Sequence, residues 1–252
     1  MPHPTVPYVL AAPGYVAGGS DWEHLTEWLL RGHGWRDVST IDQHTALASH
    51  DGRLHVALNR RGAWTWNLRA TTSAGREWAA ILGAHLPVEY VTALVDTMLR
   101  PASRHDSDVL GPLHTAGWTT DATATTAVSP DGLVRFAEET AVSPTRGGWH
   151  AACTVDGHTW WTAVFSTHTP PGVVAAFTRS LASDDPLLRM AIGTPLYGCG
   201  SYTRLTQTLR GYDDEQAQLE ARIAEARGHR LAAAPPAAPP TSSRRAPRAQ
   251  TR

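Results

Sequence analysis

Two histidines stand at equivalent places in this chain, 83 residues apart. His85 and His168 each lie two residues before a proline, and that proline begins a predicted helix. An imidazole at such a place could act as a ligand or a base, or it could hydrogen-bond to the free backbone groups at the start of the helix. Because a duplication copies structural residues faithfully, we favour the hydrogen-bonding role and keep both histidines as candidate binding residues.

Three arginines form a second group of candidates. The alternation of apolar and polar residues places Arg53, Arg69 and Arg135 on the outward faces of predicted strands. Guanidinium groups on such a face could contact the phosphates of a nucleic acid. This arrangement favours a binding surface on the outer side of a sheet.

The chain has 10 tryptophans, and six of them fall in matched pairs: Trp35 with Trp118, Trp64 with Trp149, and Trp78 with Trp161. Exposed indoles could stack on bases, but Trp64 and Trp66 share a strand face with Leu68, which favours the core. Trp160 points opposite to its neighbour Trp161. We predict that Trp160 either contacts a second sheet or is exposed for binding.

Other motifs indicate no catalytic or metal site. The stretch His105-Asp-Ser-Asp108 has residue types that bind metals, but it lies in a predicted linker without a second ligand cluster. Gly198-Cys-Gly200 is too short for a dinucleotide-binding loop. The chain has no P-loop, Gly-x-Ser-x-Gly, His-Glu-x-x-His or Cys-x-x-Cys motif. We therefore expect no catalytic residue, no metal and no cofactor.

The elements that must position the candidates occur twice. The segment 78–87 matches 161–170, with the tryptophan, an alanine, the histidine and the proline in register. Gly34-Trp35 returns as Gly117-Trp118, and the turn 49–52 answers 129–132. Ordered self-similarity of this kind indicates a duplicated structural unit.

Each unit predicts a helix, four strands and a second helix. Asp-Gly pairs at 51–52 and 131–132, between apolar runs, predict hairpins. The expected strands are 44–49, 54–58, 64–70 and 78–82 in the first unit, and 123–129, 133–136, 149–155 and 160–165 in the second. Helices are expected from Ser20 and Ser107 as N-caps, and then over 87–99 and 170–181.

The sequence thus predicts an α+β protein of two tandem α-β-β-β-β-α units, each an antiparallel four-stranded meander with helices on one face. The two units are expected to be related by pseudo-symmetry. The expected divisions are an extended N-terminal arm (1–19), a first unit (20–101), a linker and second unit (102–189), a loop and C-terminal helix (190–231), and a disordered basic tail (232–252).

The net charge of −1 is unevenly distributed. All 22 basic residues are arginine, and five of them follow Gly228 without any acid, which leaves 17 arginines against 23 acids in residues 1–227. Proteins that bind phosphates usually carry a basic surface, so we expect only weak nucleic-acid contact, through the tail arginines Arg244, Arg245, Arg248 and Arg252. Two cysteines, no signal pattern and no long apolar run predict a cytoplasmic protein without membrane contact.

The two-unit pattern resembles the SPDY family, an actinobacterial domain of unknown function usually present in two copies. The resemblance rests on Ala17-Gly-Gly-Ser20, on the two Gly-Trp pairs, on Ser129-Pro-Asp-Gly132 and on the matched Trp-x-Ala and His-x-Pro pairs, over roughly residues 15–189. The first unit has His50 where the second has Pro130. The family has no assigned activity, so the resemblance implies an architecture and leaves the function open.

Two functions from different classes remain as hypotheses. The first is a non-catalytic binding or assembly module with an unknown protein partner. The alternative is a single-stranded nucleic-acid-binding protein that uses the outer sheet faces, by analogy of fold with PUR and Whirly-type domains. A small enzyme is a third possibility without a recognisable site. The candidate binding residues in all cases are Arg53, Arg69, Arg135, Trp160, His85 and His168.

Overall fold

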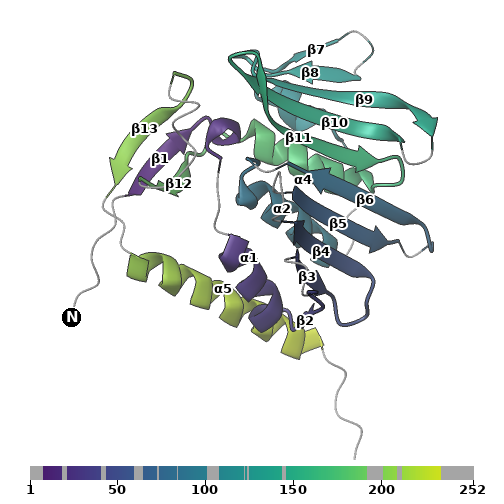
Figure 1. The fold of residues 1–252 in the computed structure, drawn as a ribbon, viewed down its shortest axis with the longest axis vertical. Helices are drawn as coiled ribbons and strands as arrows, with labels where there is room; N and C mark the ends of the chain where they lie inside the picture. The colour runs from purple at the N-terminus through teal and green to yellow at the C-terminus, as the bar shows by residue number, and fades with distance from the viewer. Residues whose placement is uncertain are drawn as a thin grey trace, which may run out of the picture.

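The computed structural model describes residues 8–18, 22–40, 44–59, 65–72, 74–83, 85–100, 108–121, 123, 125–143, 146–191, 201–208 and 212–233. The fold belongs to the α+β class. It contains a ten-stranded antiparallel sheet in the order β2-β3-β4-β5-β6-β11-β10-β9-β8-β7 and a three-stranded sheet in the order β12-β1-β13. Figure 1 shows the large sheet curving past helices α2 and α4, with the small sheet set to one side.

The two halves of the large sheet have the same order of elements. The first half comprises α1 (Trp22–Glu27), the π-helical turn η2 (Trp28–Gly32), β2 (Arg36–Asp37), β3 (His44–Ala48), β4 (Leu54–Asn59), β5 (Thr65–Thr71), β6 (Glu77–Leu82) and α2 (Val88–Leu99). The second half comprises α3 (Gly111–Thr115), β7 (Thr119–Thr120), β8 (Thr126–Val128), β9 (Val134–Ser143), β10 (Arg146–Val155), β11 (His158–Ser166) and α4 (Pro171–Ala182). Each half has five strands rather than the predicted four. The additional strands, β2 and β7, are two residues long, too short to show alternation.

The halves join where β6 pairs with β11. Across this seam Ile81 faces Val164, Ala80 faces Phe165, and Leu82 faces Ala163. The strand register also corrects one predicted match. Trp66 pairs with Leu82, and Trp149 pairs with Phe165, the counterpart of Leu82. Trp149 therefore corresponds to Trp66, 83 residues earlier, and not to Trp64, which lies outside the described residues.

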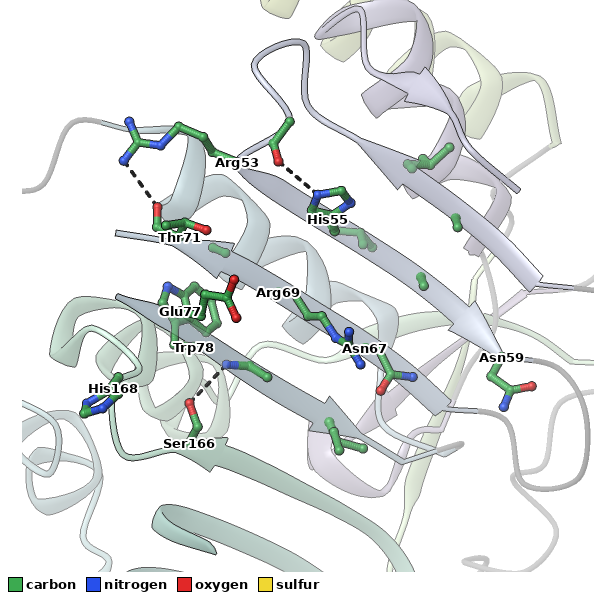
Figure 2. Close-up of a pocket in the computed structure, with 18 residues that line it drawn as sticks. Arg53, His55, Asn59, Asn67, Arg69, Thr71, Glu77, Trp78, Ser166 and His168 are labelled. Atoms are coloured by element: carbon green, nitrogen blue, oxygen red, sulfur yellow. Dashed lines mark hydrogen bonds between the residues drawn. The ribbon is translucent and has the colours of Figure 1, made fainter. Parts of the chain in front are cut away.

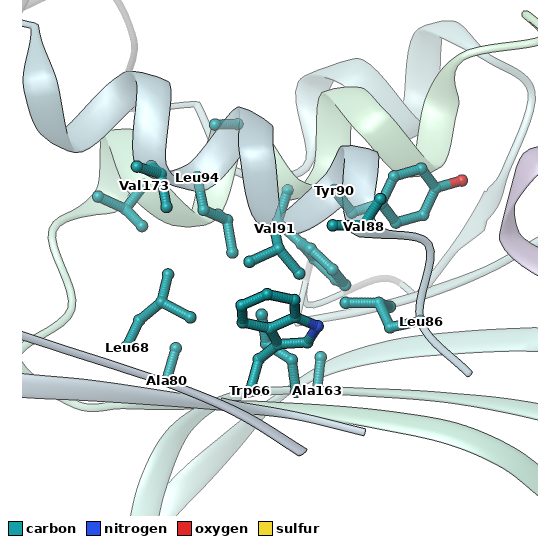
Figure 3. Packing of buried hydrophobic residues seen from close by; sticks show 14 of the residues in the cluster. Trp66, Leu68, Ala80, Leu86, Val88, Tyr90, Val91, Leu94, Ala163 and Val173 are labelled. Carbon is teal, nitrogen blue, oxygen red and sulfur yellow. The ribbon is translucent and has the colours of Figure 1, made fainter. Parts of the chain in front are cut away.

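The apolar core lies between the inner face of the large sheet and the helices. Figure 3 shows Val91 and Leu94 of α2 above Trp66, Leu68 and Ala80 of the sheet. Alternation directs these strand residues inward, because successive side chains of a strand point to opposite faces. The predicted anchors Trp78 and Trp161 are both buried, at 5% and 2% exposure.

The hairpin between β3 and β4 and the one between β8 and β9 have the same turn. In the first, Ser49 Oγ donates a hydrogen bond of 2.6 Å to Asp51 Oδ1, and the amide of Leu54 donates to Ser49 Oγ at 3.0 Å. In the second, Ser129 Oγ donates to Asp131 Oδ1 at 2.6 Å, and Val134 replaces Leu54 as the amide donor. The predicted Asp-Gly turns are thus confirmed, with Gly52 and Gly132 both at positive φ.

Segments near the two ends of the described chain form the three-stranded sheet. The predicted N-terminal arm contains β1 (Tyr8–Ala12) and the short 3₁₀ turn η1 (Gly14–Val16), and β1 pairs with β12 (Leu187–Met190) and β13 (Arg204–Thr208). Sequence patterns missed β12 and β13, because their pairing partner β1 lies about 180 to 200 residues away in the sequence. The segments 20–21, 101–107 and 192–200, which include the predicted caps and loop, lie outside the described residues.

The predicted C-terminal helix is α5 (Tyr212–Ala233), which extends two residues past the expected end at residue 231 and packs against η2. Its thin apolar stripe of Leu219, Ile223 and Ala226 is buried. Polar contacts add to this packing: Arg31 lies 2.7 Å from Glu220, and the guanidinium of Arg222 lies 4.0 Å above the ring of Trp28.

Candidate binding site

The outer face of the large sheet, opposite the helices, carries one row of cross-strand neighbours that crosses eight strands. Following the strand register, the row reads Ala46, Ala57, Asn67, Ile81, Val164, His150, Ala137 and Thr126. The row is arranged symmetrically about the pair Ile81 and Val164. Apart from His150, its side chains are small or medium-sized, so the middle of this face is shallow.

A hollow with a volume of about 950 Å³ lies over the first half of this face, and we call it the first-half hollow. Its floor includes Ala57, Ala79 and Ile81, and Figure 2 shows polar side chains around it. The polar residues that line it are Arg53, His55, Asn59, Asn67, Arg69, Thr71, Glu77, Ser166 and His168. Alanines in the floor leave the space that these longer side chains surround.

Strand alternation explains the composition of the hollow. On β4 the side chains of Val56 and Leu58 are buried inward, which turns His55, Ala57 and Asn59 outward. On β5 and β6 the same alternation turns Asn67, Arg69, Glu77 and Ile81 outward. The buried core therefore fixes which polar side chains reach the hollow.

The charged groups of the hollow differ in how they are bound. Arg53 donates a hydrogen bond of 3.3 Å to the carbonyl of Thr71, and His55 Nε2 lies 2.9 Å from the carbonyl of Gly52. The side chains of Arg69 and Glu77 form no hydrogen bond or ion pair with any residue in the described ranges. The lining thus contains two guanidinium groups and one carboxylate, and Arg69 is free to bind a ligand.

The seam supplies the far wall of the hollow. Ser166, at the end of β11, accepts a hydrogen bond of 3.0 Å from the amide of Ala79, which ties the wall to β6. His168 follows in the turn before α4 and is exposed. Figure 2 shows the His168 ring beside Ser166, on the side of Glu77 away from Arg69.

His85, the counterpart of His168, has a different environment. Its ring stacks on Trp160 with a centroid distance of 4.0 Å and an interplanar angle of 11°. Burial lowers the pKa of His85. Within the described part of the chain neither His85 nor His168 makes a hydrogen bond, so the predicted bonds to the start of each helix are absent.

Trp160 is half-buried and turns toward the seam. It lies at a β-bulge, because Cys153 pairs with Trp161 while Thr154 pairs with Thr159. Its indole Nε1 is buried and has no hydrogen-bond partner among the described residues. Trp160 was predicted to contact a second sheet or to be exposed for binding. In the structure it packs on the His85 ring instead.

The second half carries different side chains at the places that form the first-half hollow. By the turn and strand offsets, Leu133 replaces Arg53, Arg135 replaces His55, Ala152 replaces Arg69, and Trp160 replaces Glu77. Arg135 is exposed but does not line the hollow. The three arginines predicted to share one surface are thus divided between the two halves.

The structure brings together Arg53, Arg69 and His168 of the predicted set and places Arg135, Trp160 and His85 elsewhere. Sequence reasoning missed His55, Asn59, Asn67, Thr71, Glu77 and Ser166 as lining residues. Alternation already marks the outward residues of β4 to β6, but nothing in the sequence indicates Ser166, because the pairing of β6 with β11 brings it into place. The tail arginines Arg244, Arg245, Arg248 and Arg252 lie outside the described residues.

The described residues offer no metal site and no membrane-spanning helix. They contain no group of three or more His, Cys, Asp and Glu side chains placed to hold a metal ion. None of the helices in the described ranges is both long and apolar enough to span a membrane.

Comparison with known proteins identifies the family of one segment of the chain. No curated protein and no solved structure matches the chain. Residues 128–187 match the model of SPDY, a domain of unknown function (DUF317), and this match runs from the end of β8 to the start of β12. It includes the turn at Asp131 and Gly132, Trp161 and His168. Residues 128–187 therefore form a domain of the SPDY family.

Proposed function

We propose that the protein is a non-catalytic binding module and that the first-half hollow is its binding surface. One observation supports this most directly. Arg69 and Glu77 project into the hollow without partners among the described residues, whereas their counterparts are Ala152 and the stacked Trp160. In a duplicated fold, structural residues stay alike, so polar residues that differ and stay unpaired are best explained by a ligand.

The polar lining supports binding rather than catalysis. Covalent catalysis needs a nucleophile within hydrogen-bond reach of a base. Ser166 Oγ instead accepts a hydrogen bond from the Ala79 amide and lies 3.3 Å from the hydroxyl of Thr169. No histidine in the described part of the wall forms a hydrogen bond with Ser166. The arginines and amides are spread over β4, β5 and the turn before β4, an arrangement suited to hold an extended partner.

We also propose that the first half is a second SPDY unit. The same Ser-x-Asp-Gly hydrogen bonds, the same order of elements and the register about Ile81 and Val164 support this. In this proposal one unit has kept the aromatic contact of Trp160 with His85, and the other has acquired an open polar surface.

Single-stranded nucleic acid is the alternative ligand, and Arg53 and Arg69 favour it. Such binding generally uses aromatic side chains on which bases stack. Trp66, Trp78 and Trp161 are buried on the inner face, and Trp160 is covered by His85. We therefore place a protein partner first.

The test compares three immobilised proteins in a native lysate: the wild type, Arg69→Glu and Arg135→Glu. The two variants make the same charge change on exposed strand residues, one inside the hollow and one outside it. We expect a partner that is retained by the wild type and by Arg135→Glu and is lost by Arg69→Glu. Equal retention by all three proteins would show that the hollow is not the binding surface. Salt-sensitive recovery of nucleic acid that depends on Arg69 would favour the alternative ligand instead.

A further inference from the structure

The stack of Trp160 on His85 shows what an occupied version of the first-half hollow looks like. Each histidine follows the seam strand of its own half and lies beside the start of the seam strand of the other half. At that place the residue beside His85 is Trp160, and the residue at the equivalent position beside His168 is Glu77. The ring of His85 is covered, and the ring of His168 is exposed.

The side chain of Glu77 does not take the place of the indole. Figure 2 shows its carboxylate directed across the face toward Arg69, away from His168. A planar ring could therefore lie on His168 as Trp160 lies on His85, at the same 4.0 Å spacing. Aromatic pairs favour such offset stacking.

Charge defines the rest of the ligand. Besides Glu77, the hollow is lined by Arg69, Arg53 and Asn67. The free guanidinium of Arg69 suits a carboxylate, which it can bind with two parallel hydrogen bonds. Glu77 lies between the ring site and this anion site, so the carboxylate of the ligand must reach past Glu77 to Arg69.

We propose that the first-half hollow binds a segment of a partner protein in which an aromatic side chain stacks on His168 and a neighbouring acidic side chain binds Arg69. This inference rests on the proposed binding function and specifies the chemistry of the partner. The segment lies along the outer face, with the aromatic side chain at the seam and the carboxylate over β5.

The probes are three capped tetrapeptides: acetyl-Gly-Asp-Trp-Gly-amide, the same peptide with leucine for tryptophan, and the same peptide with asparagine for aspartate. Binding is followed by NMR titration of the protein, including the imidazole signals. The wild type is expected to bind the Asp-Trp peptide about threefold to tenfold more tightly than either control, the range that one stacking contact or one charge-assisted hydrogen bond supplies.

Two variants assign the two parts of the site. His168→Ala should abolish the preference for tryptophan over leucine and keep the preference for aspartate over asparagine. Arg69→Gln should do the reverse, and Arg135→Gln, on the other half, should change neither. If the wild type binds the three peptides equally, or if His168→Ala keeps the preference for tryptophan, the inference is wrong.

A third variant tests whether the stack of Trp160 on His85 is a model for a ring bound on His168. Glu77→Trp introduces an indole at the counterpart of Trp160. We expect it to shift the His168 imidazole signals upfield, as ring stacking does, and to block the Asp-Trp peptide. Unchanged His168 signals would show that a ring at this position does not stack on His168. Loss of the lysate partner in Arg69→Glu would still support the hollow as a binding surface, so failure of the peptide experiments is distinguishable from failure of the proposed function.

Discussion

Ile81 and Val164 lie directly opposite each other across the seam, and they occupy the same position in the two halves. Their neighbours are related in the same way. Ala80 faces Phe165, and the equivalent residues Ala163 and Leu82 also face each other. A local two-fold axis therefore passes between Ile81 and Val164. Both side chains are exposed on the outer face, at 50% and 41%. The axis thus emerges at the edge of the first-half hollow.

Replacement of Trp161 by alanine is expected to lower the free energy of unfolding by about 3–5 kcal/mol. The side chain is buried next to Phe177, and its Nε1 donates a hydrogen bond of 2.7 Å to the carbonyl of Tyr15. Urea unfolding followed by circular dichroism measures the change. Val164→Ala, on the outer face of the same strand, is the control and should lower the free energy of unfolding much less. Equal losses in the two variants would contradict the burial of Trp161.

The two Ser-x-Asp-Gly turns allow a matched comparison of one residue in two contexts. Asp51 and Asp131 bind their own turns alike, but Asp131 Oδ2 also accepts a hydrogen bond of 2.6 Å from the hydroxyl of Tyr15. We expect Asp131→Ala to destabilise the protein more than Asp51→Ala, by about 1–3 kcal/mol. In a Tyr15→Phe background the difference in destabilisation between Asp131→Ala and Asp51→Ala should shrink. If the difference persists, it arises from the turn itself and not from the hydrogen bond with Tyr15.

The docking of α5 predicts that Ile223→Ala lowers the free energy of unfolding by about 2–4 kcal/mol. Ile223 is 1% exposed against η2, and the approach is close: a side chain on Gly32 would lie 2.9 Å from the Cβ of Ala226. Chemical denaturation gives the stability, and hydrogen exchange reports on α5. Leu231→Ala, on an exposed part of the same helix, should leave both unchanged. An unaffected Ile223→Ala variant would mean that α5 contributes no stability.

Stability should fall as the pH decreases from neutral through about 6.5, the ordinary pKa of histidine. Burial lowers the pKa of both His33 and His85, so the folded protein keeps these rings neutral where the unfolded chain is already protonated. The unfolded state then binds more protons, and the free energy of unfolding decreases toward acid. The pKa of Asp121 is lowered to about 2 by hydrogen bonds, and its contribution is lost only as the pH falls below 3.8.

His85→Phe keeps an aromatic ring against Trp160 and removes the titrating group. Urea unfolding between about pH 5.5 and 7.5 should therefore show a smaller pH dependence for this variant than for the wild type. Parallel curves for the two proteins would show that His85 does not contribute to the acid destabilisation.

Sequence patterns predicted those parts of the fold that depend on neighbouring residues. The Asp-Gly pairs specified the hairpins, and Pro87 and Pro170 marked the starts of α2 and α4 to within a residue. The inward direction of Trp66 and Leu68 followed from alternation. Each of these features is decided within a few residues of chain.

The candidate site was less predictable, because long-range pairing builds it. Alternation showed that Arg69 and Arg135 both point outward, but the register across the seam decides that only Arg69 lies near His168. The identical sequence settings of His85 and His168 gave no sign of their different environments. That difference arises from a residue on the opposite half, Trp160 for one histidine and Glu77 for the other.

The seam at β6 and β11 also constrains any protein that carries only one such unit. In the present chain each half satisfies the backbone amides and carbonyls of the other at its seam strand. A single unit would present that strand as a bare sheet edge, which can pair with another chain. The two-fold register means that an identical copy would fit this edge directly. A one-unit relative is therefore expected to assemble as a homodimer through the strand that corresponds to β6, with two equal outer faces. Only a chain that holds both halves, like this one, can give its two faces different side chains.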